Sequence, residues 1–143
     1  MNRASSAQNG YAELPLGDEV WRLFRELPRS GSLPEPAPGA GLRLLRGEAG
    51  SESQGTWIVF HIYATDGGRV TEVRFQAYGC PHTLATAAWL AGQLPERQLE
   101  NLLPSAPADW AAALAVPVEK LGRLLLIEDA LRAITAGNGA ATP

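Results

Sequence analysis

The sequence has one cysteine, Cys80, and two histidines, His61 and His82, among its 143 residues. A single cysteine cannot form a disulfide within the chain, and the paired-cysteine spacing of a structural zinc site is absent. No stretch reaches the ~18 apolar residues that a transmembrane helix needs, and the N-terminus lacks the apolar run of a signal peptide. We therefore expect a protein of the reducing cytoplasm that does not enter a membrane.

Positive charge is also scarce. The 12 Lys and Arg residues are outnumbered by 15 Asp and Glu residues, so the formal net charge is -3. A nucleic-acid-binding face needs clustered cations, and this balance gives no reason to expect one. Phosphate-binding loops and the nucleophile elbow of hydrolases are absent as well. The candidates for chemistry are therefore few, and they lie around Cys80.

The chain does have enough apolar material to fold. Hydrophobic residues make up 45% of it, and a chain of this size buries about two-thirds of the surface that its unfolded form exposes. We predict a loose N-terminal segment over residues 1–17, a single domain over 18–137 and a C-terminal tail over 138–143. No internal repeat interrupts that domain.

Residues 18–27 carry apolar side chains at the spacing of one helical face. Asp18 is a candidate N-cap for this predicted helix, and Pro28 marks its end. The stretch 32–41 follows, with three prolines and two glycines. It predicts a surface loop rather than a domain boundary, because too little chain precedes it to form a domain.

Three strands are predicted next, over residues 42–47, 56–64 and 69–78. The last two are rich in β-branched and aromatic residues, and the "TDGG" sequence at 65–68 between them is typical of a hairpin turn. The polar stretch 48–55 is predicted to be a connection between the first two strands. The pattern therefore indicates antiparallel pairing.

The C-terminal half predicts helices. Residues 81–94 form one, shorter helical pieces occupy 95–115, and the strongest helix covers 118–136 until Gly137 stops it. The apolar stripe of this last helix consists of Leu121, Leu124, Ile127, Leu131 and Ile134. Strands followed by helices indicate an α+β fold: a three-stranded antiparallel sheet with helices packed on it.

Cys80 lies where the third predicted strand leads into a helix. Pro81 suits the first helical position, which makes Cys80 the N-cap. The free N–H groups and the positive end of the helix dipole would then favour the thiolate, the form of cysteine that reacts. A free cysteine is also commonly a small buried residue, so a reactive and a structural thiol both remain open. We predict that Cys80 is partly exposed and more acidic than a free cysteine.

His82 is the second candidate, as a metal ligand or a base. It lies two residues into the predicted helix and need not point in the same direction as Cys80. A thiol enzyme built on these two residues lacks a visible group to orient the imidazole. We expect a structural role for His61, and we expect Glu128 and Asp129 to form a solvated helix edge, because adjacent helical residues diverge by about 100°.

Three stretches together resemble the iron–sulfur cluster scaffold family, which comprises the IscU-like proteins and the N-terminal domain of NifU. "LFRELPRSGSL" resembles the family's N-terminal helix and turn, and "TDGGRVTEVRFQAYGC" resembles its hairpin, which ends in Tyr-Gly-Cys. "VPVEKLGRLLLIEDAL" resembles its C-terminal segment. The resemblance covers about residues 18–136. It implies the same α+β fold and a role in assembling or handing on iron–sulfur clusters.

The chain departs from the family in its ligands. The resemblance implies a ligand set of three cysteines, an aspartate and a histidine, of which only Cys80 is present. The other positions correspond to Gln54, Thr56, Gly122 and Arg123. The implied cargo is an iron–sulfur cluster or iron, but clusters are held by several thiolates, so we predict that the monomer does not hold one stably. A guanidinium repels metal ions, yet it stabilises a thiolate beside it.

The resemblance further implies a cysteine desulfurase and a chaperone as partners. A homo-oligomer is compatible with the sequence. Part of the chaperone-recognition segment is matched by Val116, Pro117, Val118, Glu119 and Lys120. Our leading hypothesis is a non-enzymatic iron–sulfur cluster assembly protein that accepts sulfur, carries a cluster between subunits or regulates assembly. The first alternative is an interaction module without chemistry, and the second is a thiol enzyme using Cys80 and His82.

Overall fold

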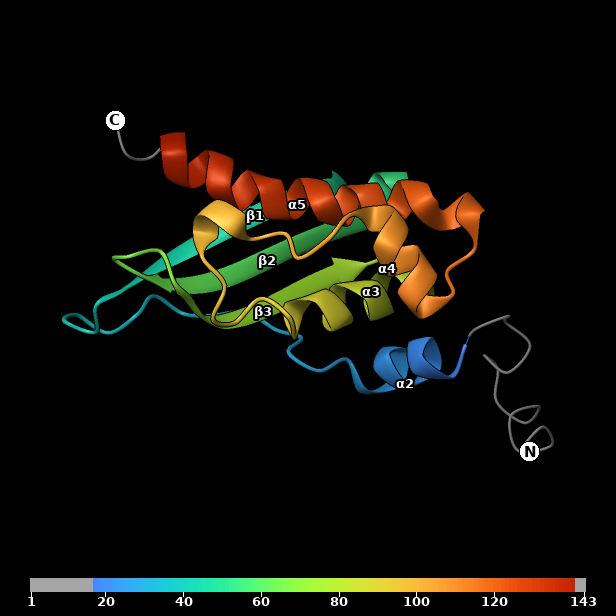
Figure 1. Ribbon diagram of the computed structural model, residues 1–143, viewed down its shortest axis with the longest axis horizontal. Helices are drawn as coiled ribbons and strands as arrows, with labels where there is room; N and C mark the ends of the chain where they lie inside the picture. The colour runs from blue at the N-terminus through green and yellow to red at the C-terminus, as the bar shows by residue number, and fades with distance from the viewer. Residues whose placement is uncertain (1–16, 141–143) are drawn as a thin grey trace.

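The structure, a computed structural model, describes residues 17–140, with side chains up to residue 136. The predicted domain boundaries near residues 17 and 138 lie at the margins of this range and remain predictions. The elements, in chain order, are α2 (Asp18–Glu26), β1 (Leu42–Ser51), η1 (Glu52–Gln54), β2 (Thr56–Thr65), β3 (Val70–Tyr78), α3 (Pro81–Ala91), η2 (Leu99–Asn101), α4 (Pro107–Leu114), η3 (Val118–Lys120) and α5 (Leu121–Ala140) (Figure 1).

The three strands form one antiparallel sheet in the order β1-β2-β3. Gly47, Phe60 and Phe75 face one another across it, which gives the register of the three strands. The β2–β3 hairpin closes at the predicted turn, where the N–H of Thr65 donates to the carbonyl of Arg69. The α+β fold class, the three-stranded antiparallel sheet and the hairpin predicted from the sequence are confirmed.

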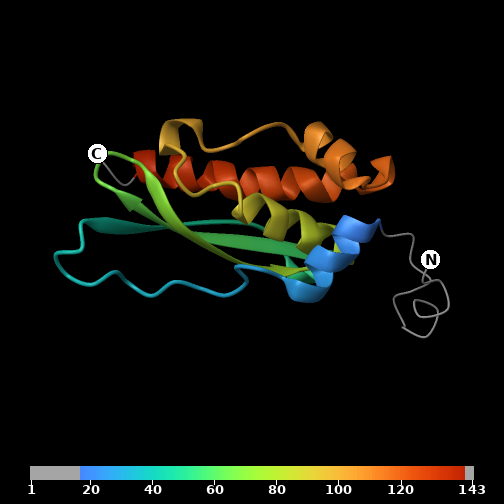
Figure 2. The ribbon, with the colours of Figure 1, turned by 60° about the horizontal axis from the view of Figure 1, so that its bottom comes forward.

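The two faces of the sheet are covered differently. Helices α3, α4 and α5 lie on one face, above the sheet in Figure 2, and alternate residues of β2 such as Ile58, Phe60 and Ile62 are buried beneath them. The loop that precedes β1 runs along the opposite face (Figure 2). There the N–H of Leu33 donates to Nδ1 of His61 at 3.2 Å. His61 is therefore structural, as expected.

The predicted amphipathic helices pack as their periodicity indicates. Four residues of the α5 stripe are buried and the fifth is partly buried against the core: Leu124, Ile127, Leu131 and Ile134, with Leu121. Helix α2 buries Val20 and Leu23 and packs against α3. Within residues 17–140, no helix combines the length and the apolar character needed to cross a membrane.

Strand β1 is longer than the prediction of 42–47. It runs to Ser51, which pairs with Thr56 at the start of β2, so the first half of the predicted connection at 48–55 is strand. The error arose because exposed polar residues at 48–51 were interpreted as a loop, whereas an edge strand with one solvated face carries polar residues too. The remaining connection is a single turn of 3₁₀ helix, η1.

Two predicted helix ends were also wrong. The N-cap of α2 is Gly17, and Asp18 lies in the first helical turn, where its charge still favours the helix dipole. Helix α5 continues through Gly137 to Ala140. A glycine destabilises a helix by only about 1 kcal/mol relative to alanine. A helix therefore ends at a glycine only when the residues that follow are more stable in another conformation.

Gly47 is the point at which α5 meets the sheet. A β-carbon at this position would lie 2.1 Å from the carbonyl oxygen of Ala130 and 2.6 Å from Cγ1 of Ile134. Both contacts are closer than atoms tolerate, and the first is to backbone that cannot rotate away. The absence of a side chain on β1 is therefore what lets α5 lie against the strand.

We predict that Gly47→Ala destabilises the fold by about 1–3 kcal/mol, the usual cost of forcing extra atoms into a packed core. Gly122→Ala is the matched control, because a β-carbon there meets nothing within 4 Å and the position is helical. Alanine at Gly122 is expected to leave stability unchanged or raise it by up to about 1 kcal/mol. Chemical denaturation of both variants checks this, and equal stabilities would show that α5 can move away from β1.

Candidate functional site

Cys80 lies at the junction between β3 and α3. Its backbone is extended, with φ -79° and ψ 166°, and it is the N-cap residue of α3, with Pro81 at the start of the helix. This confirms the position predicted from the sequence. The thiol is half-buried. The first free N–H groups of α3 therefore lie next to the sulfur.

The surroundings of the thiol act on its pKa in opposite directions. Burial is the largest single influence and raises the pKa of Cys80, but hydrogen bonding from the Thr83 hydroxyl, the N–H groups of Thr83 and His82 and the charge of Arg123 together lower it further than burial raises it. Thr83 Oγ1 lies 3.4 Å from Sγ. The N–H groups make no capping hydrogen bond of standard geometry, so they act mainly as dipoles. The pKa of Cys80 thus lies below its ordinary value.

Arg123 reaches this site from a distant part of the sequence. It lies in the first turn of α5, and its charge lowers the pKa of both Cys80 and His82. The start of α5 is therefore close to the start of α3. The resemblance described above predicts a family ligand at position 123, where this chain carries a cation.

His82 is buried, whereas the thiol of Cys80 is half-exposed. Its residue is 4% exposed, and Nε2 has no hydrogen-bond partner among the described residues. Burial lowers its pKa, Lys120 and Arg123 lower it further, and Glu119 acts against them. The imidazole is thus neutral near pH 7. The buried ring is out of reach of a substrate, and its lowered pKa makes it a weaker base, which weakens the case for a thiol enzyme.

The other positions for which the resemblance predicts family ligands, Gln54, Thr56 and Gly122, lie at the same end of the molecule as Cys80. Trp57 pairs with Tyr78, which places Thr56 beside the end of β3. Thr56 is buried, whereas Gln54 in η1 is exposed and Gly122 is exposed at the start of α5. None of these side chains supplies a thiolate or a carboxylate.

The donor set does not fit a metal ion or a cluster. In the part of the chain that the structure describes, no three His, Cys, Asp or Glu residues come together in a way that could hold a metal. One thiolate beside a guanidinium offers a single ligand and a repelling charge. What the arrangement can do is keep Cys80 partly ionised and partly accessible.

The segment predicted to bind a chaperone is only partly available. Val116 belongs to the hydrophobic core. Val118 in η3 is 80% exposed, and Glu119 beside it is exposed as well. Any partner that binds this segment therefore contacts Val118 and its C-terminal neighbours rather than the whole stretch.

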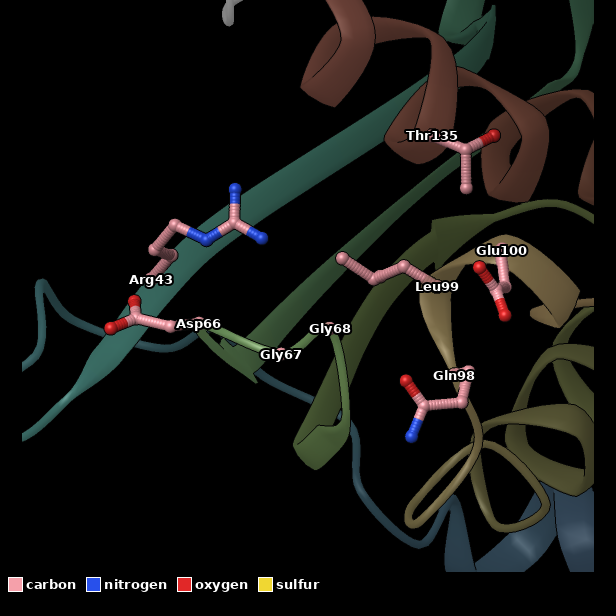
Figure 3. Close-up of a pocket in the computed structure, with 8 residues that line it drawn as sticks. All are labelled: Arg43, Asp66, Gly67, Gly68, Gln98, Leu99, Glu100 and Thr135. Carbon is pink, nitrogen blue, oxygen red and sulfur yellow. The ribbon is translucent and has the colours of Figure 1, made fainter.

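A pocket of about 320 Å³ lies at the opposite end of the sheet, beside the β2–β3 turn (Figure 3). In Figure 3 the side chains of Arg43 and Glu100 approach it from opposite sides. Its lining consists of Arg43, Asp66, Gly67, Gly68, Gln98, Leu99, Glu100 and Thr135. None of these is a cysteine or a histidine, and the pocket is remote from Cys80. The sequence pattern predicted the turn but not the pocket. Residues 98–100, which are distant from the turn in sequence, come to line the pocket only in the folded structure.

Comparison with known proteins gives a consistent picture. The family model described as NifU-like N terminal domain matches residues 17–137. Iron-sulfur cluster assembly protein 2 of Arabidopsis thaliana is 27% identical over 108 residues, which are 75% of this chain and 64% of that protein. The iron-sulfur cluster assembly scaffold protein IscU of Escherichia coli K12 is 27% identical over 90 residues, 63% of this chain and 70% of that protein. The match thus spans less than two-thirds of the Arabidopsis relative.

Solved structures share the fold at low sequence identity. A protein described as an iron–sulfur cluster assembly scaffold of the SUF system, from Fervidobacterium islandicum AW-1, has a TM-score of 0.61 at 13% identity and covers 83% of this chain and 95% of its own. The N-terminal part of a NifU-like protein from Brucella abortus has a TM-score of 0.56 at 14% identity, covering 94% and 98%. These similarities show that the chain shares the fold of these two structures.

We predict that alkylation of Cys80 by iodoacetamide has its pH midpoint below the ~8.5 of a free cysteine. Thr83→Val removes the strongest stabilising contact of the thiolate and moves the midpoint to higher pH, and Arg123→Ala moves it in the same direction by less. Arg132→Ala is the control, because Arg132 lies on the same helix but pairs with Glu128. Rates measured across a pH series check this order. A wild-type midpoint at or above that of a free cysteine would instead indicate a structural thiol.

Proposed function

The chain belongs to the family of NifU-like N-terminal domains, and from this we propose that it is a scaffold-like protein of iron–sulfur cluster assembly that accepts sulfur on Cys80. The relatives named above are cluster assembly proteins. The observation that carries the proposal is the half-buried thiol at the N-cap of α3, whose pKa lies below its ordinary value. In this role the chain is an acceptor rather than an enzyme.

Sulfur acceptance suits this site better than cluster holding. A cluster needs several thiolates at one place, and no such group exists among the described residues. Sulfur transfer needs only one nucleophilic thiolate that a donor can reach. Arg123 opposes the binding of metal ions, but it favours an anionic sulfur both before and after transfer. The replacement of a ligand by a cation therefore agrees with sulfur acceptance and disagrees with cluster binding.

The transfer itself is a thiol–disulfide type of exchange. The thiolate of Cys80 attacks the outer sulfur of a donor persulfide, R–S–SH. A bond forms between Sγ and that sulfur while the S–S bond of the donor breaks, and R–S⁻ leaves. The product is a persulfide on Cys80, whose proton passes to the leaving thiolate or to water. One sulfur atom changes carrier, and no external oxidant or reductant is consumed.

Two partners belong to the proposal. The donor is the persulfide of a cysteine desulfurase, and the second partner is a chaperone. Exposed apolar side chains near the thiol support docking at this end of the molecule: Tyr78, two residues before Cys80, is 51% exposed, and Val118 is 80% exposed. Apolar residues held in contact with water are typical of surfaces that bind other proteins.

A second candidate function rests on these same exposed residues. Tyr78 and Val118 would serve an interaction module that binds a desulfurase or a chaperone without chemistry at Cys80. The two functions differ in one measurable property, the arrival of sulfur on the thiol. A third, the thiol enzyme, is disfavoured because His82 is buried and its pKa is lowered, which makes it an inaccessible and weaker base.

We predict that the protein gains one sulfur atom when it is incubated with a cysteine desulfurase and L-cysteine, or with glutathione persulfide. Intact-mass spectrometry should show the added sulfur on wild type, its removal by dithiothreitol and its absence from Cys80→Ser. Arg123→Ala should gain sulfur more slowly at pH 7, because a smaller fraction of its thiol is ionised. A Cys80 that is alkylated readily but takes sulfur from neither donor would favour the interaction module.

We also predict that the purified monomer holds no stoichiometric zinc or iron, either as isolated or after anaerobic reconstitution with iron and sulfide. The reason is the single thiolate beside Arg123. Elemental analysis and the visible absorbance of the reconstituted protein provide the measurement. A tightly bound metal on each chain, lost in Cys80→Ser, would contradict this and restore the cluster-carrying role.

A further inference from the structure

The two edges of the sheet differ in how their backbone groups are satisfied. On the β3 edge, Phe75 exchanges hydrogen bonds with residues 29–31, and Val70 exchanges them with 96–97. On the β1 edge, no backbone hydrogen bond joins residues 44–49 to any part of residues 17–140 other than β2. Alternate residues of a strand direct their N–H and C=O groups to opposite sides. The outward set on β1 therefore has no protein partner within the part of the chain that the structure describes.

Strand β1 also lacks devices that commonly block an edge. Sheets protect their edges with proline, with bulges or with a covering segment. Residues 44–49 hold no proline and pair with β2 one for one, without a bulge. Only after them does the chain leave the extended conformation, at Gly50 with φ +81°. The edge is therefore regular over about 20 Å, which is enough to template another strand.

Helix α5 covers this edge from one side of the sheet. It packs mainly on β1 and less on β2 (Figure 1), and at Gly47 the carbonyl oxygen of Ala130 lies directly above the strand. A helix with its side chains is about 10 Å wide and strands are about 4.8 Å apart. A helix centred on an edge strand therefore projects past it by about one strand. The space beside β1, where an added strand would lie, is covered by α5.

The flank of α5 that projects past β1 is apolar. Leu126 and Ala133 are half-buried and lie on the side of α5 opposite Leu131, which faces the 99–103 segment. Both are one helical turn from Ala130, the residue that meets β1. The outward backbone of β1 and this apolar flank together make one surface, which we call the β1–α5 edge.

The position of α5 restricts what can occupy the β1–α5 edge. A second copy of the chain cannot supply its own β1, because the α5 helix above that strand would overlap with this one. A strand of any other sheet with a helix packed on the same face is excluded for the same reason. The occupant is therefore an extended segment with no helix above it, such as a tail or a long loop. Peptides of this kind add to exposed sheet edges in a known mode of recognition.

Two exposed charges on β1 select the sequence of such a segment. Arg46 and Glu48 flank Gly47 and lie on the face of the sheet away from α5. They contact each other at 2.9 Å, and Glu48 also accepts a hydrogen bond from Nε1 of Trp57. Opposite charges directly across a strand pair stabilise it, and like charges destabilise it. A complementary segment therefore has an acidic residue opposite Arg46 and a basic residue opposite Glu48.

We propose that the β1–α5 edge binds an extended segment of a partner protein as a fourth, antiparallel strand. From its N-terminus to its C-terminus, the segment carries a basic residue opposite Glu48, a small residue opposite Gly47 and an acidic residue opposite Arg46. The central residue is small because α5 comes very close to the sheet at Gly47. The residues on either side of the charged pair are apolar and face the flank of α5. Antiparallel pairing continues the pattern of the sheet and is slightly more stable than parallel pairing.

Binding at this edge leaves the thiol accessible. Cys80 follows β3, which is separated from β1 by β2. A segment added to the outer side of β1 therefore lies more than about 10 Å from β3. The inference goes beyond the proposed sulfur acceptance, and either can fail without the other.

Titration of the isotope-labelled full chain with two synthetic peptides, followed by NMR, tests the proposal. The matched peptide is acetyl-Val-Lys-Ala-Glu-Val-Thr-amide, and the swapped peptide exchanges its Lys and Glu. The matched peptide should shift the amide resonances of residues 44–49 and slow their hydrogen exchange. Its dissociation constant should be about tenfold lower than that of the swapped peptide, because two charge pairs change sign. The double variant Arg46→Glu, Glu48→Arg should reverse this preference.

A second pair of variants tests the contribution of α5. Ala133→Leu fills the space under the projecting flank and should abolish binding of the matched peptide. Ala136→Leu is the matched control, because Ala136 is exposed on the same helix, and it should leave binding unchanged. Thermal unfolding by circular dichroism shows that each variant is folded.

Three outcomes would overturn the proposal. The first is a matched peptide that changes nothing at millimolar concentration. The second is a preference of wild type for the swapped peptide, which would indicate parallel pairing. The third is slow exchange of every amide of residues 44–49 in the free chain, which would show that a terminal segment or a second copy already covers the edge.

Discussion

The contact between α5 and β1 at Gly47 is the constraint on which the rest of the structure depends. Helix α5 lies against the strand because Gly47 presents no atom where the carbonyl oxygen of Ala130 and the side chain of Ile134 lie. This contact sets the height and the direction of α5 above the sheet. The position of Arg123, in the first turn of the helix, follows from it. A buried glycine in β1 thus helps to set where Arg123, at the start of α5, lies relative to the thiol of Cys80 at the start of α3.

The thiol site is a balance between burial and hydrogen bonding. Burial of Cys80 favours the neutral form, and it would win if the sulfur faced only apolar groups. Thr83, the N–H groups at the start of α3 and Arg123 each favour the anion instead. The site thereby lowers the pKa of the Cys80 thiol without a metal. This is a different use of the strand-to-helix junction from one in which several cysteines converge on a cluster, and it needs only one of them.

The sequence by itself determined the features that depend on near neighbours. The helical stripe of α5, the β2–β3 hairpin and the N-cap position of Cys80 follow from periodicity, turn residues and Pro81, because these act within a few residues. Local pattern also suggested a strand end after residue 47 and a helix end at Gly137, and both were wrong. Pairing with β2 extends β1 to Ser51, and the helical conformation of α5 persists through the glycine.

Only the tertiary structure decided the rest of the site. It buried His82 and Val116, left Val118 exposed and brought Arg123 to within electrostatic range of Cys80. The resemblance to a family suggested that last contact, but no local pattern could, since 42 intervening residues separate the two positions. The physical reason is that burial and charge proximity are properties of packed elements. They depend on how α3, α5 and the sheet meet, and that is settled by contacts such as the one at Gly47.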